Sequence, residues 1–160
     1  MKMEWMGQYR DVVESLIRYC NIYAGVYKKE SMVYGDVTYS YSQIQVLEYL
    51  LENEERQDNM SVIASRLGIS RSNFSKIVNR LESKGLVEKC CMQGSRKELT
   101  VTVNAFGKAL YAEYAQRILK HHFQPMFREL EKIPEEQYPH IAAALYKAMG
   151  PGKDAEGEEA

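Results

Sequence analysis

The stretch that decides the fold is Ser61–Glu88, which reads SVIASRLGISRSNFSKIVNRLESKGLVE. Its apolar residues recur at helical spacing before and after Gly68, so the sequence predicts a short helix, a tight turn and a second helix. Asn59 and Ser70 are suited to cap the two helices, and Gly68 and Gly85 are suited to end them. This layout is that of a helix-turn-helix.

The outer face of the second helix predicts contact with double-stranded DNA. It carries Arg71, Lys76 and Arg80 and has no acidic residue before Glu82. Short hydrogen-bonding and cationic side chains allow such a helix to enter the major groove and meet base edges. The DNA-contacting residues predicted here are Ser61, Ser70, Arg71, Ser72, Asn73, Ser75, Lys76, Asn79 and Arg80.

After Gly85 the apolar residues alternate with polar ones. Leu99, Val101 and Val103 follow period two, which indicates a strand. A strand over 87–92 would pair with it in a hairpin that turns near residues 93–95. We expect this hairpin to be a wing, and an Arg near its tip could reach the minor groove. The predicted contacts of the wing are Arg96 and Lys97.

Helical spacing also marks the flanks of this core. An amphipathic helix is predicted over residues 7–30, then a loop at 34–38, then a helix with Ser42 as N-cap. Residues 52–59 are polar and are expected to be a connector. A long helix capped by Asn104 should kink or break at Pro125, and another should begin near Pro134.

The predicted fold is therefore mainly α with a small β-hairpin wing (α+β). The expected parts are an N-terminal helix over 1–33, a winged helix-turn-helix domain over 40–104, helices over 105–149 and a disordered acidic tail over 150–160. The terminal helices carry more apolar surface than a small winged core can cover, so a homodimer is expected to bury it. The apolar residues proposed for that interface are Leu110, Tyr114, Ile118 and Leu145.

Composition limits the function further. The 160-residue chain has a net charge of −1, which excludes a uniformly basic chromatin-type protein. Residues 56–97 nevertheless hold nine Lys and Arg against three Asp and Glu, which favours a polyanion partner for this segment. No apolar run approaches the roughly 18 residues of a membrane span. Three cysteines are not a disulfide framework, so a cytoplasmic protein with free thiols is expected.

No signature of an enzyme is present: the sequence lacks a phosphate-binding Gly loop, a nucleophile elbow and a metal triad. Cys90 and Cys91 are consecutive on a strand and would face opposite sides. His121 and His122 are adjacent on a helix and would not share a face. We therefore expect no catalysis, no cofactor and no metal.

Ser61–Glu88 closely resembles the winged helix-turn-helix core of the MarR family, and residues 42–47 and 101–107 resemble its flanks. The resemblance covers about residues 40–110 and implies a transcription regulator, expected to be a repressor. Such a protein binds a pseudo-palindromic operator as a homodimer, built through its terminal helices, and often responds to a small molecule. The sequence departs from the family where Gly94 replaces the usual wing Asp, which predicts a softer wing.

The regulatory input is expected to be a small apolar or phenolic effector. A cleft with apolar walls and hydroxyl tips would suit such a guest, and the candidate lining residues are Tyr23, Tyr27, Tyr39 and Tyr41.

Two alternatives remain open. A peroxide-sensing branch of the same family uses a reactive Cys on the first helix, where this chain has Cys20. Its apolar helical face predicts a buried, inert thiol instead. The other alternative is a winged-helix module that binds proteins and no operator.

Overall fold

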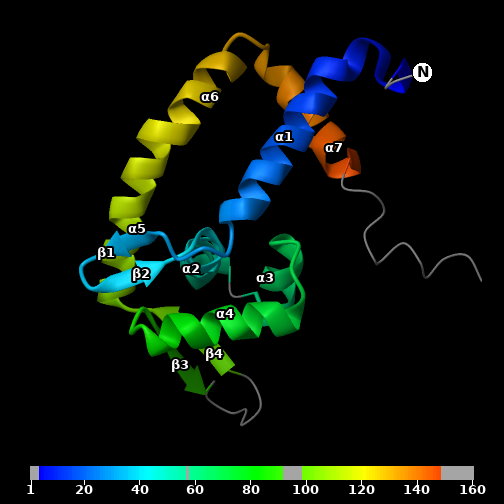
Figure 1. The fold of residues 1–160 in the computed structure, drawn as a ribbon. Coiled ribbons are helices and arrows are strands. Elements are labelled where there is room, and N and C mark those ends of the chain that lie inside the picture. Colours follow the sequence, from blue (N-terminus) through cyan, green and yellow to red (C-terminus); the bar gives the residue numbers. More distant parts are fainter. Residues whose placement is uncertain (1–3, 57, 92–98, 149–160) are drawn as a thin grey trace, which may run out of the picture. The chain divides into compact units, whose positions relative to one another are not determined.

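The computed structural model describes residues 4–56, 58–91 and 99–148 (Figure 1). The chain forms two compact units that divide between Glu113 and Tyr114, and each is described by itself. The elements in chain order are η1 (Glu4–Tyr9), α1 (Arg10–Val26), β1 (Met32–Tyr34), β2 (Val37–Tyr39), α2 (Tyr41–Arg56), α3 (Met60–Arg66), α4 (Arg71–Ser83), β3 (Val87–Cys91), β4 (Leu99–Val103), α5 (Ala105–Ile118), η2 (Leu119–Phe123), α6 (Gln124–Leu130), η3 (Glu135–Gln137) and α7 (Tyr138–Ala148).

The predicted helix-turn-helix is present as α3 and α4. Asn59 Oδ1 accepts hydrogen bonds from the backbone N–H groups of Ser61 and Val62 at 3.0 and 3.1 Å, so it caps α3 as expected. Ser70 Oγ accepts from the Asn73 N–H at 3.2 Å and caps α4. Gly68 and Gly85 both have φ of 68°, the left-handed conformation that ends a helix.

The start of α2 corrects one expectation. Ser40, and not Ser42, caps this helix: Ser40 Oγ accepts from the Gln43 N–H at 3.4 Å, and the Ser40 N–H donates to Gln43 Oε1 at 3.1 Å. This reciprocal pair is a capping box. Ser42 lies inside the helix, and its hydroxyl contacts that of Ser40 at 2.9 Å. The helix also continues to Arg56, so the connector is shorter than predicted.

The predicted loop at 34–38 is instead a β-hairpin. β1 and β2 pair antiparallel, with Tyr34 opposite Val37, so only Gly35 and Asp36 lie in the turn. Gly35 has φ of 56°, which a two-residue hairpin turn requires. The strands are three residues each, too short for their alternation to stand out in the sequence.

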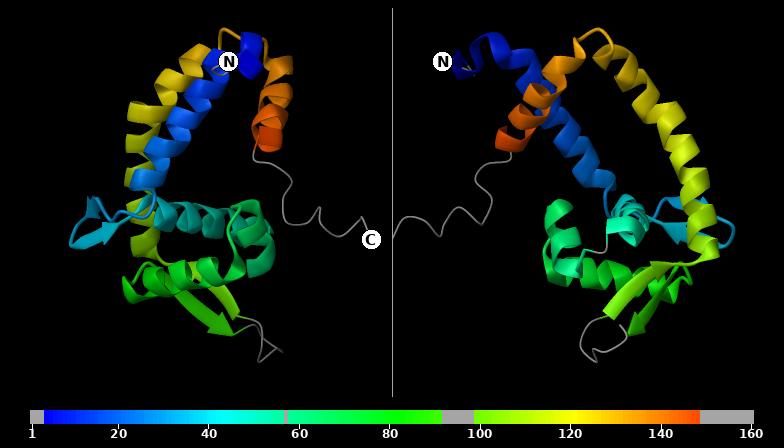
Figure 2. Two further views of the ribbon diagram at one scale, coloured as in Figure 1. Left: turned by 45° about the vertical axis from the view of Figure 1, so that its right-hand side comes forward. Right: turned by 180° about the vertical axis from the view of Figure 1, so that it is seen from behind.

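The wing is present as the antiparallel pair β3 and β4, with Val87 opposite Val103 and Cys91 opposite Leu99. Both views in Figure 2 place this hairpin on the far side of α4 from α1. Its predicted tip, with Arg96 and Lys97, lies outside the described residues. Asn104 caps α5 as expected: its Oδ1 accepts from the Gly107 N–H at 2.9 Å, and its Nδ2 donates to the Gly85 carbonyl at 2.8 Å.

The core of the first unit sits where α2, α3, α4 and the wing meet. The predicted inner face of α4 is confirmed, because all four of its members are buried. Leu110 on α5 is also buried, at 1% exposure, and Tyr114, the first residue of the second unit, is 8% exposed. These two residues therefore do not offer the free apolar surface that was predicted for them. The principal buried side chains are Ile44, Leu47, Leu50, Ile63, Ala64, Phe74, Ile77, Val78, Leu81, Leu86, Val101 and Val103.

Helix α1 differs from the core helices because none of its residues is buried. Cys20 is exposed, so the prediction of a buried thiol at this position is wrong for the single chain. The helical spacing of apolar residues did predict the helix correctly, but Cys20 on that helix is not buried. An amphipathic pattern marks a face suited to burial; it does not say what buries it.

The C-terminal elements follow the expected breaks. The regular α-helix α5 ends at Ile118, a π-helical turn (η2) follows, and α6 begins with Pro125 near its N-terminus. Proline has no backbone N–H, and the first turn of a helix tolerates this lack. Pro134 precedes η3 and α7, and the Tyr138 hydroxyl donates to the Leu130 carbonyl at 3.0 Å. Throughout the described part of the chain, every helix is too short or too polar to cross a membrane.

Candidate DNA-binding face and tyrosine cluster

Helix α4 presents most of its predicted DNA-contacting residues to solvent. Its apolar side packs into the core through Phe74 and Val78, which fixes how the helix is rotated. Arg71, Lys76 and Arg80 are consequently exposed on the opposite side. Ser72, Lys76 and Asn79 follow steps of four and three residues, so they lie along one stripe of the helix.

The structure separates the described cations of residues 56–91 into two groups. Arg56, Arg66, Lys84 and Lys89 all form ion pairs. Among the residues that the structure describes, Arg71, Lys76 and Arg80 form no ion pair with a carboxylate. The charge count of this segment therefore overstated its free positive charge, and what remains of it within the described residues is concentrated on α4.

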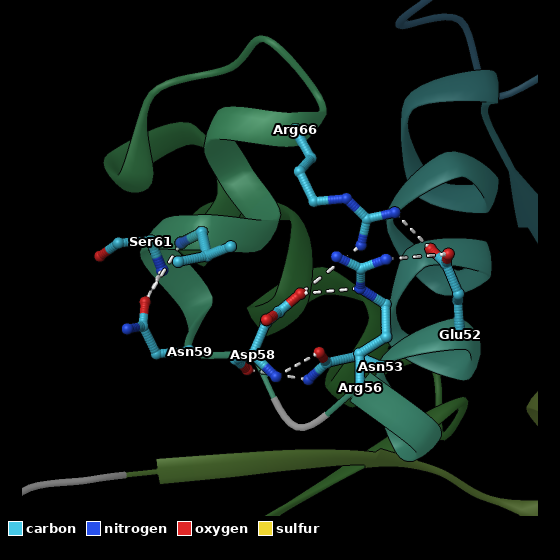
Figure 3. Close-up of polar contacts among 8 residues, drawn as sticks. Glu52, Asn53, Arg56, Asp58, Asn59, Ser61 and Arg66 are labelled. Carbon is cyan, nitrogen blue, oxygen red and sulfur yellow. Dashed lines mark hydrogen bonds and ion pairs between the residues drawn. The ribbon is translucent and has the colours of Figure 1, made fainter.

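The junction between α2 and α3 is held by a polar cluster (Figure 3). Arg66 on α3 contacts Glu52 on α2 at 2.6 Å, and Arg56 contacts Asp58 at 3.0 Å. Asn53 exchanges two hydrogen bonds with the backbone of Asp58, at 2.9 and 2.7 Å. These contacts orient α3 on α2 and so help position the helix-turn-helix.

A second polar network holds the C-terminal end of α4. Lys84, the C-cap residue of α4, pairs with Glu30 at 2.8 Å and donates to the Thr38 carbonyl at 2.5 Å and to Gln43 Oε1 at 3.2 Å. Gln43 Nε2 also donates to Glu30 at 2.8 Å. The hydrogen bond from Lys84 is the main reason that the pKa of Glu30 is lowered from its ordinary value. Sequence analysis missed this network because its members are far apart in the chain.

A third contact joins α4 to the wing. Lys89 on β3 donates to Asn79 Oδ1 at 2.6 Å and pairs with Glu82 at 2.5 Å. Glu82 is the only acidic residue of α4. The contact thus neutralises that carboxylate and ties β3 of the wing to α4.

Three of the four predicted effector-site tyrosines lie together. The ring of Tyr23 is 5.3 Å from that of Tyr27 and 6.0 Å from that of Tyr41, and Gln45 Nε2 donates to the Tyr23 hydroxyl at 2.6 Å. Burial, with smaller contributions from neighbouring tyrosines, raises the pKa of Tyr23 to about 12. Tyr39 is buried at the end of β2. Tyr19, which was not predicted, stacks on Tyr23 at 5.7 Å.

A shallow hollow of about 430 Å³ lies along η1 and α1. It was not predicted, because its lining mixes apolar and polar residues of one helix that show no motif. The residues that line it are Met6, Glu14, Ile17, Arg18, Asn21 and Ile22.

Comparison with known proteins gives a family match for the helix-turn-helix region. The model of the MarR family matches residues 36–91, which run from the β1–β2 turn through α4 into the wing. This segment, which holds the helix-turn-helix, is therefore similar to the MarR family. The match covers the helix-turn-helix and the first strand of the wing, and the terminal helices lie outside it. No curated protein matches the sequence closely enough to count as a relative.

Solved structures agree with the MarR fold. Wild-type ZitR from Lactococcus lactis in complex with DNA is 17% identical with a TM-score of 0.59, covering 90% of this chain and 97% of that one. A MarR-family transcriptional regulator from Rhodococcus sp. RHA1 is 21% identical with a TM-score of 0.59, covering 87% and 92%. The PcaV regulator from Streptomyces coelicolor in complex with its natural ligand is 14% identical with a TM-score of 0.60, covering 99% of each chain.

The MarR fold brings the predicted site residues of α4 onto one side, with Asn73 and Ser75 half-buried at its margin. Ser61 and Ser70 are exposed at the starts of α3 and α4. The Ser70 hydroxyl is engaged in the cap, and Asn79 is held by Lys89. Within the described residues, no three His, Cys, Asp or Glu side chains gather closely enough to hold a metal ion.

Proposed function

We propose that this protein is a homodimeric repressor of the MarR family that binds a pseudo-palindromic operator through α4 and releases it when a small apolar or phenolic molecule binds. One observation supports the proposed DNA-contacting role of α4. Its exposed Arg71, Lys76 and Arg80 keep their charges free within the described residues, while the neighbouring cations are paired. Free guanidinium and ammonium groups on an exposed helix suit phosphates and guanine edges.

The homodimer is supported by the apolar surface of the terminal helices. With Leu110 and Tyr114 buried, the surface left for a partner comes mainly from η1, α1 and the segment after α5. A second copy would cover it, and two-fold symmetry would place two α4 helices one turn of DNA apart, about 34 Å. The large apolar residues left exposed there are Trp5, Tyr9, Val12, Ile17, Tyr19, Ile22, Leu119, Phe123, Met126, Phe127, Ile133, Leu145 and Tyr146.

The effector is proposed to bind near Tyr23, Tyr27, Tyr39 and Tyr41. Tyr41 begins α2, whose N-terminal turn carries Gln43, and Gln43 shares a network with the C-cap residue of α4. A guest that separates the rings of Tyr23 and Tyr41 would therefore act on elements bonded to the recognition helix. In an allosteric release, the guest must favour the non-binding arrangement over the DNA-binding one.

The test is selection of binding sites from a random-sequence duplex library. We expect an enriched site with two inverted half-sites whose centres are about 10 base pairs apart. Enrichment of a single half-site would contradict the dimeric arrangement. Retention of DNA with no sequence preference would contradict operator binding and favour the protein-interaction alternative.

Exposure of Cys20 favours one second candidate, regulation by peroxide. An accessible thiol meets one requirement of a redox sensor. Operator binding after mild peroxide should then be lost in the wild type and kept in Cys20→Ser. If peroxide affects operator binding of the two proteins equally, Cys20 is not the sensor, and the small-molecule effector remains the proposed input.

A further inference from the structure

The contact between Lys89 and Asn79 fixes which way the Asn79 amide points. The Lys89 ammonium is 2.6 Å from Asn79 Oδ1 and 2.5 Å from Glu82 Oε2. A lysine ammonium has three donors and no acceptor, so only the carbonyl oxygen of Asn79 can face it. The amide NH2 of Asn79 must therefore point away from Lys89.

Lys89 is well held in this place. Asn79 and Glu82 are three residues apart on α4, so they are neighbours on its surface and receive the ammonium together. The Lys89 side chain is only 22% exposed. Its backbone is part of the wing, opposite Val101. Because its charge is neutralised by Glu82, Lys89 is less suited to a phosphate contact than Arg71 or Lys76.

This orientation restricts what Asn79 can recognise. An asparagine prefers adenine when it forms two hydrogen bonds, accepting from the N6 amino group and donating to N7. The carbonyl oxygen of Asn79 is turned toward Lys89, which engages one of its lone pairs, so the side of the exposed amide that points away from Lys89 carries the two N–H donors. Guanine presents two major-groove acceptors, N7 and O6, and so matches a group that only donates.

We propose that Lys89 is a positioning residue that makes Asn79 a donor-only contact, so that Asn79 selects guanine over adenine in the major groove. This inference rests on the proposed use of α4 in DNA binding. It goes further by assigning a base preference to one residue and the control of that preference to the wing. Lys89 on β3 would then contribute to base specificity without contacting the DNA.

Site selection with matched variants tests this proposal. Wild type, Lys89→Met, Asn79→Ala and the control Lys108→Met would each select from the same random-sequence library. Lys108 also pairs with a glutamate, Glu54 at 2.9 Å, but joins α5 to α2. We expect the control to keep the wild-type base preferences. Lys89→Met should gain adenine at one symmetric position of each half-site, by roughly fivefold or more relative to guanine. Asn79→Ala should lose its preference at that same position.

The outcomes separate the possible failures. If Lys89→Met binds less tightly but keeps every wild-type base preference, Lys89 is only a structural support and the proposal is overturned. A second variant, Asn79→Asp, does not depend on Lys89→Met folding: it keeps the pairing with Lys89 but has no N–H donor. It should lose the guanine preference, and retention of that preference overturns the proposal. A folded wild type that enriches no sequence overturns the operator function and this inference together.

Discussion

At the residue scale, the close packing around Gly107 explains why glycine is needed there. Gly107 lies in the first turn of α5, against the backbone of Leu86 in the short connection between α4 and β3. A Cβ at this position would collide with the Leu86 carbonyl oxygen and lie 2.8 Å from Val103 Cγ1. Leu86 is fully buried, and its carbonyl is part of the backbone, so it cannot move aside freely.

We expect Gly107→Ala to lower the free energy of unfolding by about 1–3 kcal/mol, as overpacking usually does. The matched control is Gly25→Ala in α1, where a Cβ meets nothing within 4 Å. The control should be neutral or stabilising by up to about 1 kcal/mol, since alanine favours helix more than glycine. Urea unfolding of the two variants measures both values. Equal destabilisation by both would contradict the packing argument.

The second prediction at the residue scale concerns the contact of Lys76 with DNA. Its exposed charge has no carboxylate partner within the described residues, so Lys76→Ala should weaken operator binding by about 1–3 kcal/mol if it contacts a base. Lys108→Ala removes a cation that is already paired with Glu54 and should leave affinity nearly unchanged. Fluorescence anisotropy with labelled operator DNA gives both affinities. Wild-type affinity for Lys76→Ala would remove this residue from the interface.

At the scale of elements, three polar contacts hold α4 and its neighbours. The cluster around Glu52 and Asp58 joins α2 to α3, Lys84 joins the end of α4 to the β1–β2 hairpin and α2, and Lys89 joins α4 to the wing. The pairs are partly exposed, so each contributes little to stability on its own. Their importance is geometric, because they tie α3, α4 and the wing into one arrangement.

The network at the end of α4 predicts a pH dependence. The pKa of Glu30 is lowered in the folded chain, mainly by the hydrogen bond from Lys84. A carboxylate whose folded pKa lies below its unfolded value stabilises the fold above the unfolded pKa, about 4.3, and loses that effect as the pH falls through the folded pKa. The wild type should therefore be more stable than Glu30→Gln at pH 7, and this difference should shrink below about pH 4. Thermal unfolding across this range measures it, and a difference independent of pH would exclude the carboxylate as its source.

At the scale of the whole molecule, the exposed apolar residues of the terminal helices predict a dimer. Sedimentation at micromolar concentration should give a mass near twice 18.5 kDa. Ile22→Glu places a charge on α1 at a position that is 59% exposed in the single chain, so it should favour the monomer without unfolding it. Val62→Asp on α3, also exposed, is the control and should remain dimeric. A wild-type monomer would remove the basis for paired half-sites.

The local features of the fold were predictable from the sequence because they depend on neighbouring residues. Asn59, Ser70 and Asn104 cap the helices that follow them, and Gly68 and Gly85 end the helices before them. Capping and positive φ are set within one turn of the chain. The period-two pattern ending at Val103 likewise predicted the wing strands. The cations of α4 predicted to contact DNA became exposed because the apolar spacing of the helix determines its buried side.

Tertiary structure decided the features that depend on contacts between distant residues. Ser40 and Ser42 were both plausible caps, and the reciprocal bond with Gln43 selects Ser40. Leu110 and Cys20 both lie in helices with apolar faces, yet the core buries the first and leaves the second exposed. Most decisively, the charge of residues 56–97 is divided by ion pairs to Glu30, Glu52, Asp58 and Glu82. A sequence counts charges, but only the folded chain determines which of them are neutralised, because ion pairs require closeness in space.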